Sequence, residues 1–172
     1  MMRVTLRPFR DEDIGGMRAW MTDPESTRFL GGAYALPQTW EMTENRLRRI
    51  LEGDAGGVQF AVADAGTGKY VGQCDLMMID HTAQKAEVAM VLCPEARGKG
   101  LGREALEMLC RYAFHAQNLR RLYLYVAEDN RAAVRCYEAA GFETEGRLRE
   151  HMYADGRFRD VLVMARMRKE DE

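Results

Sequence analysis

The feature that most constrains the fold of this chain is a glycine-rich segment between a mostly apolar run and an amphipathic run. Residues 97–102 read Arg-Gly-Lys-Gly-Leu-Gly, and they follow residues 86–93, which have the composition of a strand that ends at Pro94. Residues 103–114 come next, and their apolar side chains recur with the period of a helix. A strand, a glycine turn and a helix N-terminus together form a place where backbone N–H groups and the helix dipole can hold a phosphate.

Two common glycine motifs do not fit this segment. A Walker A loop needs Ser or Thr directly after its lysine, whereas Gly100 follows Lys99. A dinucleotide fingerprint that started at Gly98 would need a third glycine where Arg103 stands. The segment instead reads R-x-x-G-x-G after a strand that ends near a proline. A turn that is glycine-rich only for tight packing would look similar.

A second motif lies at residues 130–142, where the spacing is N-x-x-A-x-x-x-Y-x-x-x-G-F. The preceding residues 121–126 are rich in β-formers, and Asp129 or Asn130 can cap a helix that starts there. In this order and at this separation, the two motifs resemble the two signatures of the GNAT superfamily of N-acetyltransferases. Residues 145–161 resemble the branch that contains ribosomal-protein N-terminal acetyltransferases and spermidine acetyltransferases.

The resemblance implies an α/β (α+β) fold, with residues 1–172 as a single N-acetyltransferase domain. It implies a mixed, mostly antiparallel twisted sheet of about seven strands, with helices on both faces and a splayed central parallel pair. Hydrophobic periodicity and turn residues predict a compatible order of elements. The predicted strands are 4–7, 58–64, 70–79, 85–92, 121–126, one from 142 and 159–168; the predicted helices are 11–21, 38–51, 103–114 and 130–140, with a loop around Pro24.

The resemblance further implies that acetyl-CoA, as the acyl donor, lies between two strands that part near Cys93. Its pantetheine arm would pair with free backbone groups of Val91, Leu92 and Cys93. Its pyrophosphate would be held by N–H groups of the glycine segment with two basic side chains nearby, and Asn130 would bond the pantetheine or thioester region. The implied contacts are Val91, Leu92, Cys93, Arg97, Gly98, Lys99, Gly100, Leu101, Gly102, Arg103 and Asn130.

Acetyl transfer passes through a tetrahedral oxyanion, which a strand N–H near Val91 or Leu92 could stabilise. Tyr137, placed by the second motif, would protonate the leaving thiolate; a core aromatic residue is the alternative. The amine must be neutral to attack, and Glu87 at the start of the central strand would be the base; an exposed strand-end charge is the alternative. Because nothing beside Cys93 would lower its pKa, we expect direct transfer in a ternary complex rather than an acyl-enzyme.

Composition and charge exclude several other classes of function. The chain has 172 residues and a net charge of −2, which argues against nucleic-acid binding, and the basic cluster of Arg46, Arg48 and Arg49 is interpreted as a solvated helix face. Four cysteines without a C-x-x-C pair and three isolated histidines predict no metal site. No apolar run is long enough to cross a bilayer and the start has no secretory signal, so we expect a cytoplasmic protein without membrane contact. An exposed edge strand would allow a homodimer.

We therefore expect an acetyl-CoA-dependent N-acetyltransferase that acts on a primary amine of a small molecule or peptide, such as a protein N-terminus or a polyamine. The alternative is a catalytically silent acyl-CoA-binding or sensor module, although such a module would not need Tyr137. A nucleotide-binding regulatory domain is disfavoured because the Walker and dinucleotide residues are missing. Residues 20–45 and 145–160 should contact the acceptor, and they carry no recognisable motif for its identity.

Overall fold

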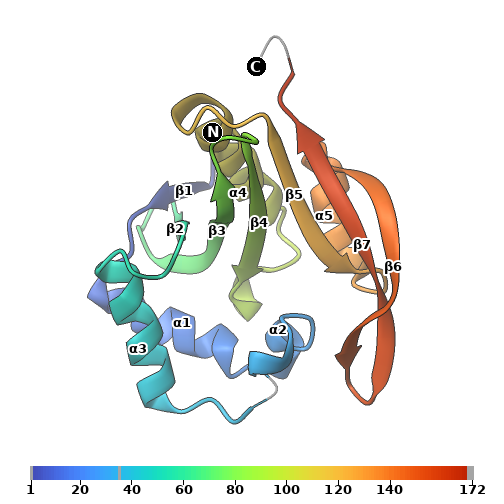
Figure 1. Cartoon of the computed structure of the whole chain (residues 1–172). Helices are drawn as coiled ribbons and strands as arrows, with labels where there is room; N and C mark the ends of the chain where they lie inside the picture. The colour runs from blue at the N-terminus through green and yellow to red at the C-terminus, as the bar shows by residue number, and fades with distance from the viewer. Residues whose placement is uncertain (1, 35, 170–172) are drawn as a thin grey trace.

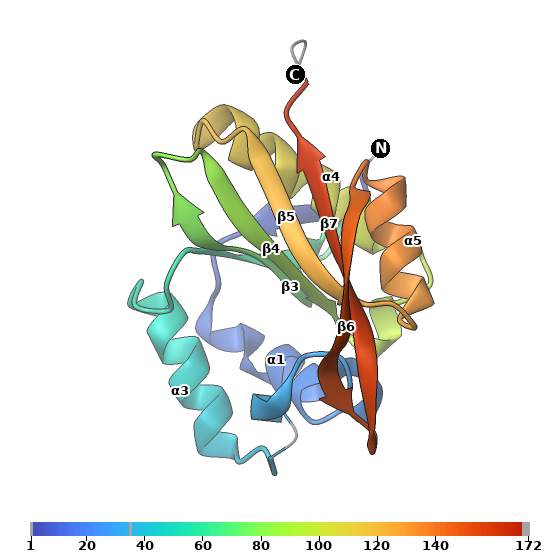
Figure 2. The same cartoon turned by 45° about the vertical axis from the view of Figure 1, so that its right-hand side comes forward.

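A seven-stranded sheet organises the chain in the order β1-β2-β3-β4-β5-β7-β6 (Figures 1 and 2). This computed structural model describes residues 2–34 and 36–169. Neighbouring strands are antiparallel except β4 and β5, which are parallel, so β1 and β6 form the edges. The strands are β1 Val4–Arg7, β2 Val58–Asp64, β3 Tyr70–Asp80, β4 Lys85–Leu92, β5 Arg121–Ala127, β6 Glu143–Ala154 and β7 Arg157–Met167.

Helices cover both faces of the sheet. One face of β3 carries Tyr70, to which Trp20 of the first helix donates a hydrogen bond. On the opposite face, Gly102 packs against Met90 of β4 and Cys136 of the last helix, so α4 and α5 share that side (Figure 2). The helices are α1 Ile14–Met21, α2 Pro24–Thr27, α3 Trp40–Leu51, α4 Leu101–Arg111 and α5 Arg131–Ala139, with 3₁₀ turns at Asp11–Asp13, Gly32–Tyr34 and Pro94–Ala96 and a π-helical turn at Tyr112–Ala116.

Most expected elements are present, and two differ in an instructive way. The expected loop around Pro24 is wrong, because Asp23 accepts the Ser26 N–H at 2.9 Å and so caps the short helix α2, with proline in its first turn. The helix after the glycine segment begins at Leu101 rather than at residue 103. Its N-cap is Gly100, whose φ of +75° is left-handed and easily adopted by glycine.

The parallel pairing of β4 and β5 is short. The two strands are in register only from Lys85 opposite Arg121 to Glu87 opposite Tyr123. Beyond these residues β4 continues to pair with β3, while β5 continues to pair with β7, so each strand follows its own half of the sheet. The strands therefore part well before Cys93, where we expected the separation.

The core lies between the sheet and the helices on each face. On α4 the apolar stripe of Ala105, Leu106 and Leu109 is buried, as the helical periodicity of this segment predicts. It belongs to one cluster with Leu122 and Leu124 of β5. Burial of each leucine contributes about 1.5–3 kcal/mol, so this stripe fixes α4 and the glycine segment at its start. In the described residues, no helix is long and apolar enough to cross a membrane.

Candidate active site

The glycine segment forms an open turn in which the three glycines have two different roles. Gly98 and Gly100 have φ values of +70° and +75°, which L-residues rarely adopt. Gly102 is needed for packing, because a Cβ there would lie 3.0 Å from Met90 Cε and 3.1 Å from Cys136 Sγ. Conformational freedom thus explains the first two glycines and close helix–sheet packing explains the third.

The backbone donors of this turn are free. The first-turn N–H groups of α4 have no intrahelical acceptor, as in any α-helix, and no side-chain cap in the described residues accepts from them. Within the described part of the chain, the N–H groups of Gly98, Lys99 and Gly100 find no acceptor either. The first-turn carboxylate of Glu104 is neutralised by Arg3, whose Nε donates to it at 2.7 Å. These donors and the helix dipole suit a phosphate group.

The basic side chains of the turn are placed differently from one another. Arg97 Nη2 donates to Asp23 Oδ2 at 2.9 Å and also contacts the hydroxyl of Ser26, while its Nε donates to the Leu92 carbonyl at 3.3 Å. Arg97 therefore ties the turn to α2, whereas Lys99 is exposed. The two remaining predicted contacts in the turn are Leu101, which is half-buried, and Arg103, which is exposed and pairs with Glu107 at 2.8 Å.

The end of β4 offers fewer free backbone groups than we expected. The N–H of Cys93 donates to the Val71 carbonyl of β3 at 2.9 Å, so the expectation that it is free is wrong. Antiparallel pairing alternates along a strand, so Val91 also directs its backbone toward β3 and Leu92 directs its N–H toward the gap with β5. Of these three residues, Leu92 is the one that presents a backbone donor to the gap.

The thiol of Cys93 is poorly suited to nucleophilic catalysis. Its side chain is buried, and burial together with the charge of Glu95 raises its pKa to about 12. The sulfur lies 3.5 Å from the carbonyl oxygen of Gly16, to which the thiol donates. A thiol that stays protonated at neutral pH is a weak nucleophile, which argues against an acyl-enzyme on Cys93.

Tyr137 occupies the buried face of α5. Its side chain is 7 % exposed, and its ring centroid lies 5.8 Å from that of Phe142. Burial raises the pKa of its phenol well above the ordinary value, and the neighbouring thiols of Cys136 and Cys74 raise it further. Cys74 belongs to β3, so the phenol lies close to the sheet on its α4/α5 face. The phenol is therefore protonated at neutral pH, as a general acid must be.

Asn130 and its neighbour have separate tasks. Asn130 is the N-cap of α5, and its Oδ1 accepts the Ala133 N–H at 3.3 Å. Asp129, the other expected cap, pairs instead with Arg157 at 2.8 Å and with Arg159. The contact of Asn130 with the acyl donor stays a prediction.

Glu87 lies at the point where β4 and β5 begin to part. It is opposite Met77 of β3 and beside Tyr123 of β5. Its side chain is half-buried, and burial raises the pKa of its carboxyl group. It shares a sheet face with Val91, which is the face covered by α1 and α3. Glu87 is therefore neither a fully exposed charge at a strand end nor a fully buried carboxyl group.

A buried hydrogen-bonded chain on the same face was missed by sequence reasoning. Trp20 Nε1 donates to Tyr70 Oη at 3.0 Å, the Tyr70 hydroxyl lies 3.5 Å from Gln73 Oε1, and Gln73 Nε2 donates to Asp75 Oδ2 at 2.9 Å. All four side chains are buried. The available signal was the period-two recurrence of Gln73 and Asp75 in an otherwise apolar strand, which indicates a polar row on a buried surface.

Asp75 ends this chain with an incompletely bonded carboxylate. Its Oδ1 is buried and has no hydrogen-bond partner among residues 2–34 and 36–169. Burial raises the pKa of Asp75 to about 6, although the positive charge of Arg46 on α3 opposes this rise. Arg46 is turned inward, with its guanidinium 5.7 Å from the ring centroid of Trp20. The expectation that Arg46 is a solvated surface residue is therefore wrong, whereas Arg48 and Arg49 are exposed.

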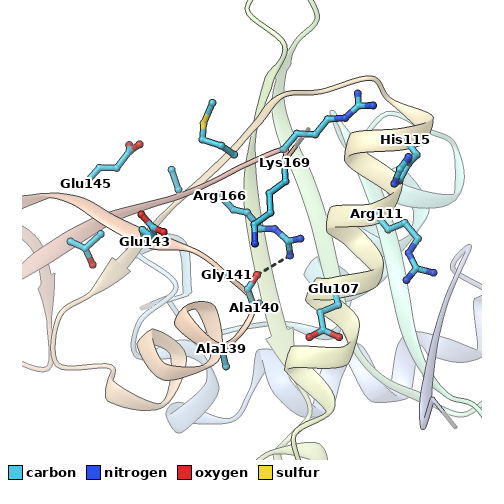
Figure 3. A pocket seen from close by; sticks show the side chains of 14 residues that line it. Glu107, Arg111, His115, Ala139, Ala140, Gly141, Glu143, Glu145, Arg166 and Lys169 are labelled. Carbon is cyan, nitrogen blue, oxygen red and sulfur yellow. Dashed lines mark hydrogen bonds between the residues drawn. The ribbon is translucent and has the colours of Figure 1, made fainter. Parts of the chain in front are cut away.

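A hollow of about 810 Å³ lies elsewhere, between α4, the end of α5 and the end of β7 (Figure 3). Arg166 crosses its floor and donates to the Ala140 carbonyl at 2.9 Å. None of the predicted site residues lines it, so this hollow is separate from the predicted donor site. In the described part of the chain, no group of three His, Cys, Asp or Glu side chains is placed to hold a metal ion.

Known proteins are similar to this chain in sequence. A family profile described as "Acetyltransferase (GNAT) domain" matches residues 3–143. The spermidine N(1)-acetyltransferase of Escherichia coli (strain K12) is 34% identical over 172 residues, which cover 94% of this chain and 84% of that protein. The uncharacterized N-acetyltransferase p20 of Bacillus licheniformis is 29% identical over 170 residues, with 98% and 94% covered.

Solved structures agree with the sequence comparisons. A crystal structure of spermidine N-acetyltransferase from Vibrio cholerae in complex with CoA and spermine aligns with a TM-score of 0.85. It is 27% identical, and the alignment covers 96% of this chain and 95% of that one. The expected α/β fold, with a seven-stranded mixed sheet that contains one parallel pair, is thereby confirmed. The chain belongs to the GNAT family of N-acetyltransferases.

Proposed function

We propose that this protein transfers an acetyl group from acetyl-CoA directly to a primary amine, and that polyamines are the acceptor class to test first. The observation that carries the proposal is that an acid and a base lie on opposite faces of the sheet, with the base at the point where β4 and β5 part. Protonated Tyr137 lies on the α4/α5 face, and Glu87 lies on the α1/α3 face where β4 and β5 part. The relatives named as spermidine acetyltransferases support the choice of acceptor.

The donor would be held mainly by main-chain groups. The free N–H groups from Gly98 to Gly100 and the uncapped start of α4 would bind the pyrophosphate. The pantetheine arm would enter the gap between β4 and β5, where Leu92 presents its N–H. Lys99 would add a mobile positive charge, while Arg97 keeps the turn in place through α2.

The chemical steps follow from these positions. A protonated amine first loses a proton toward Glu87, directly or through water, because a free lysine-like amine has a pKa near about 10.4. The neutral nitrogen attacks the thioester carbon, a C–N bond forms, and the Leu92 N–H stabilises the oxyanion. The C–S bond then breaks and Tyr137 protonates the leaving sulfur. The nitrogen releases its second proton, and the phenol is reprotonated from solvent.

The proposal is tested by Tyr137→Phe in the full chain. Turnover should fall by about 10²- to 10⁴-fold, because the general acid is lost, while acetyl-CoA affinity measured by calorimetry stays the same. Tyr112→Phe is the matched control, because the hydroxyl that it removes accepts a hydrogen bond from Gln117 at 2.8 Å outside the site. Unchanged turnover in Tyr137→Phe would remove the phenol from the mechanism. Acetyl-CoA binding without transfer to any polyamine, peptide or amino sugar would instead indicate a silent binding module.

A further inference from the structure

The strongest unexplained feature of the molecule is the free oxygen of Asp75. The residue is 6 % exposed and its Oδ2 accepts one hydrogen bond from Gln73. From the part of the chain that the structure describes, its Oδ1 accepts none. An ionised carboxylate can accept several hydrogen bonds, and an unpaired acceptor in a buried site is costly. Native proteins keep such groups mainly where a ligand, a water or a catalytic role explains them. Oδ1 therefore indicates a missing donor.

The position of Asp75 connects this oxygen with the reaction. Asp75 is opposite Ala89 of β4, and the next pair on this face is Met77 with Glu87. Ala89 lies just beyond the last pair of β4 with β5, so Asp75 flanks the part of β4 that borders the gap. Diagonal neighbours on paired strands are about 7–8 Å apart, so the backbone positions of Asp75 and Glu87 are separated by about the length of one short diamine.

The surroundings of Asp75 already accommodate a positive charge. Arg46 approaches from α3, and its charge lowers the pKa of Asp75. The Arg46 guanidinium lies over the ring of Trp20, and the ring of Tyr34 lies 5.7 Å from the same ring. Aromatic faces stabilise cations, and Arg46 Nε is itself buried without a hydrogen-bond partner. The free protein thus holds Asp75 near a side-chain cation without a closed ion pair.

The chain that ends at Asp75 fixes the direction of its carboxylate. Trp20, Tyr70 and Gln73 connect α1 to Asp75 through successive buried hydrogen bonds, and the last of them occupies Oδ2. Arg46 from α3 is the charged group that acts on Asp75. The titratable groups on which Asp75 acts are Tyr34 from the turn at Gly32–Tyr34 and Tyr70 and Cys74 from β3, and Cys93 also acts on Tyr70. Arg46 is the one cation among them, so no second built-in positive charge saturates the carboxylate.

We propose that Asp75 anchors a second, non-reacting ammonium group of the acceptor through Oδ1, while Glu87 serves the nitrogen that is acetylated. The inference rests on the proposed function and adds the residue that selects diamines over monoamines. In this scheme the substrate ammonium binds next to Asp75, on the side from which Arg46 approaches in the free protein. Trp20, Tyr70 and Gln73 are positioning residues, because they hold the carboxylate and do not touch the substrate.

The test compares one diamine with one monoamine of the same carbon chain, 1,4-diaminobutane and 1-aminobutane, in wild type and in Asp75→Asn. Wild type should prefer the diamine in kcat/KM, and Asp75→Asn should reduce this preference by about 10- to 100-fold, as expected for one charge-assisted hydrogen bond. The KM for acetyl-CoA should not change. Glu87→Gln is the matched control, because it should lower turnover with both amines to the same extent.

The outcomes separate this inference from the proposed function. If wild type acetylates both amines and Asp75→Asn keeps the diamine preference, the role of Asp75 is overturned while the acetyltransferase assignment stands. If wild type acetylates no amine, the proposed function itself fails. A merely structural Asp75 would lower activity with both amines equally. If Asp75→Asn does not fold, Gln73→Leu is the second variant, because it removes the hydrogen bond that orients the Asp75 carboxylate. It should reduce the diamine preference by about threefold or more. An unchanged preference in Gln73→Leu also counts against the inference.

Discussion

The proposed donor side and the proposed acceptor side of this molecule are built in opposite ways. The proposed donor side is one continuous segment, residues 97–102, and would bind through backbone N–H groups. The proposed acceptor side brings Trp20 from α1, Arg46 from α3 and Asp75 from β3 to one face of the sheet, and would bind through side chains. Main-chain binding requires glycine at fixed spacing and so leaves a readable motif, whereas side-chain binding assembled from distant segments does not.

The two sides also differ in charge, and the sheet separates them. The start of α4 offers free N–H groups and the positive end of a helix dipole to an anion. The opposite face of β3 and β4 carries the carboxylates of Asp75 and Glu87, which suit a cation. The gap between β4 and β5 connects the two faces. An anionic donor and a cationic acceptor could therefore bind from opposite faces and meet at the gap.

The largest effect we expect concerns the stability of the acceptor side. Because the pKa of Asp75 is about 6 in the folded protein and about 3.9 in the unfolded chain, its ionisation opposes folding. The stability it contributes is fully present below pH about 4 and is lost as pH rises through 6. The difference in unfolding free energy between Asp75→Asn and wild type should therefore shift in favour of the variant by about 3 kcal/mol when the pH is raised from about 4 to about 8. Urea titrations at both pH values measure this; a difference that does not vary with pH would contradict it.

The next effect concerns the donor side. Gly100→Val places a branched side chain at φ +75°, which costs about 1–3 kcal/mol and should distort the turn that offers the N–H groups. The dissociation constant of acetyl-CoA, measured by calorimetry, should rise by about 10- to 100-fold. Gly53→Val is the control for backbone strain, because Gly53 has the same φ of +75° in the turn after α3. A Cβ at Gly53 would meet nothing within 4 Å, whereas a Cβ at Gly100 would lie 3.2 Å from Nη2 of the flexible Arg3 side chain. Gly53→Val should lower the melting temperature without changing acetyl-CoA affinity; equal affinities in the two variants would place the donor elsewhere.

The same contrast explains how much of the molecule was predictable from sequence. Local patterns predicted the strand, turn and helix around Gly100, and the spacing to Tyr137 predicted the second motif. The features that the local patterns did not predict depend on pairing between segments that are distant in the sequence. The N–H of Cys93 is used because β4 stays paired with β3 to its end, and no local pattern encodes that length of pairing. Arg46 looked like a surface residue because its inward partner, Asp75, is on a distant strand.

The smallest effect we expect concerns the ion pair between Asp23 of the α2 cap and Arg97 of the glycine segment. Asp23 caps α2 and also accepts a hydrogen bond from Arg97 of the glycine segment. Asp23→Ala should lower the unfolding free energy at neutral pH by about 1 kcal/mol, mainly through loss of the cap. The hydrogen bonds from Ser26 and Arg97 lower the pKa of Asp23, so its contribution is present at neutral pH and is lost as pH falls through that lowered pKa.

Acetyl-CoA affinity decides what this link does. If Arg97 only positions the turn, the affinity of Asp23→Ala should stay within about threefold of wild type, because backbone N–H groups carry the binding. Asp54→Ala, at an exposed residue after α3, is the control and should change stability by less than about 0.5 kcal/mol. A clear gain in affinity would show that Arg97, once released from Asp23, binds the pyrophosphate itself. The donor side would then depend on a side chain as well, and the contrast between the two sides would be weaker than the structure indicates.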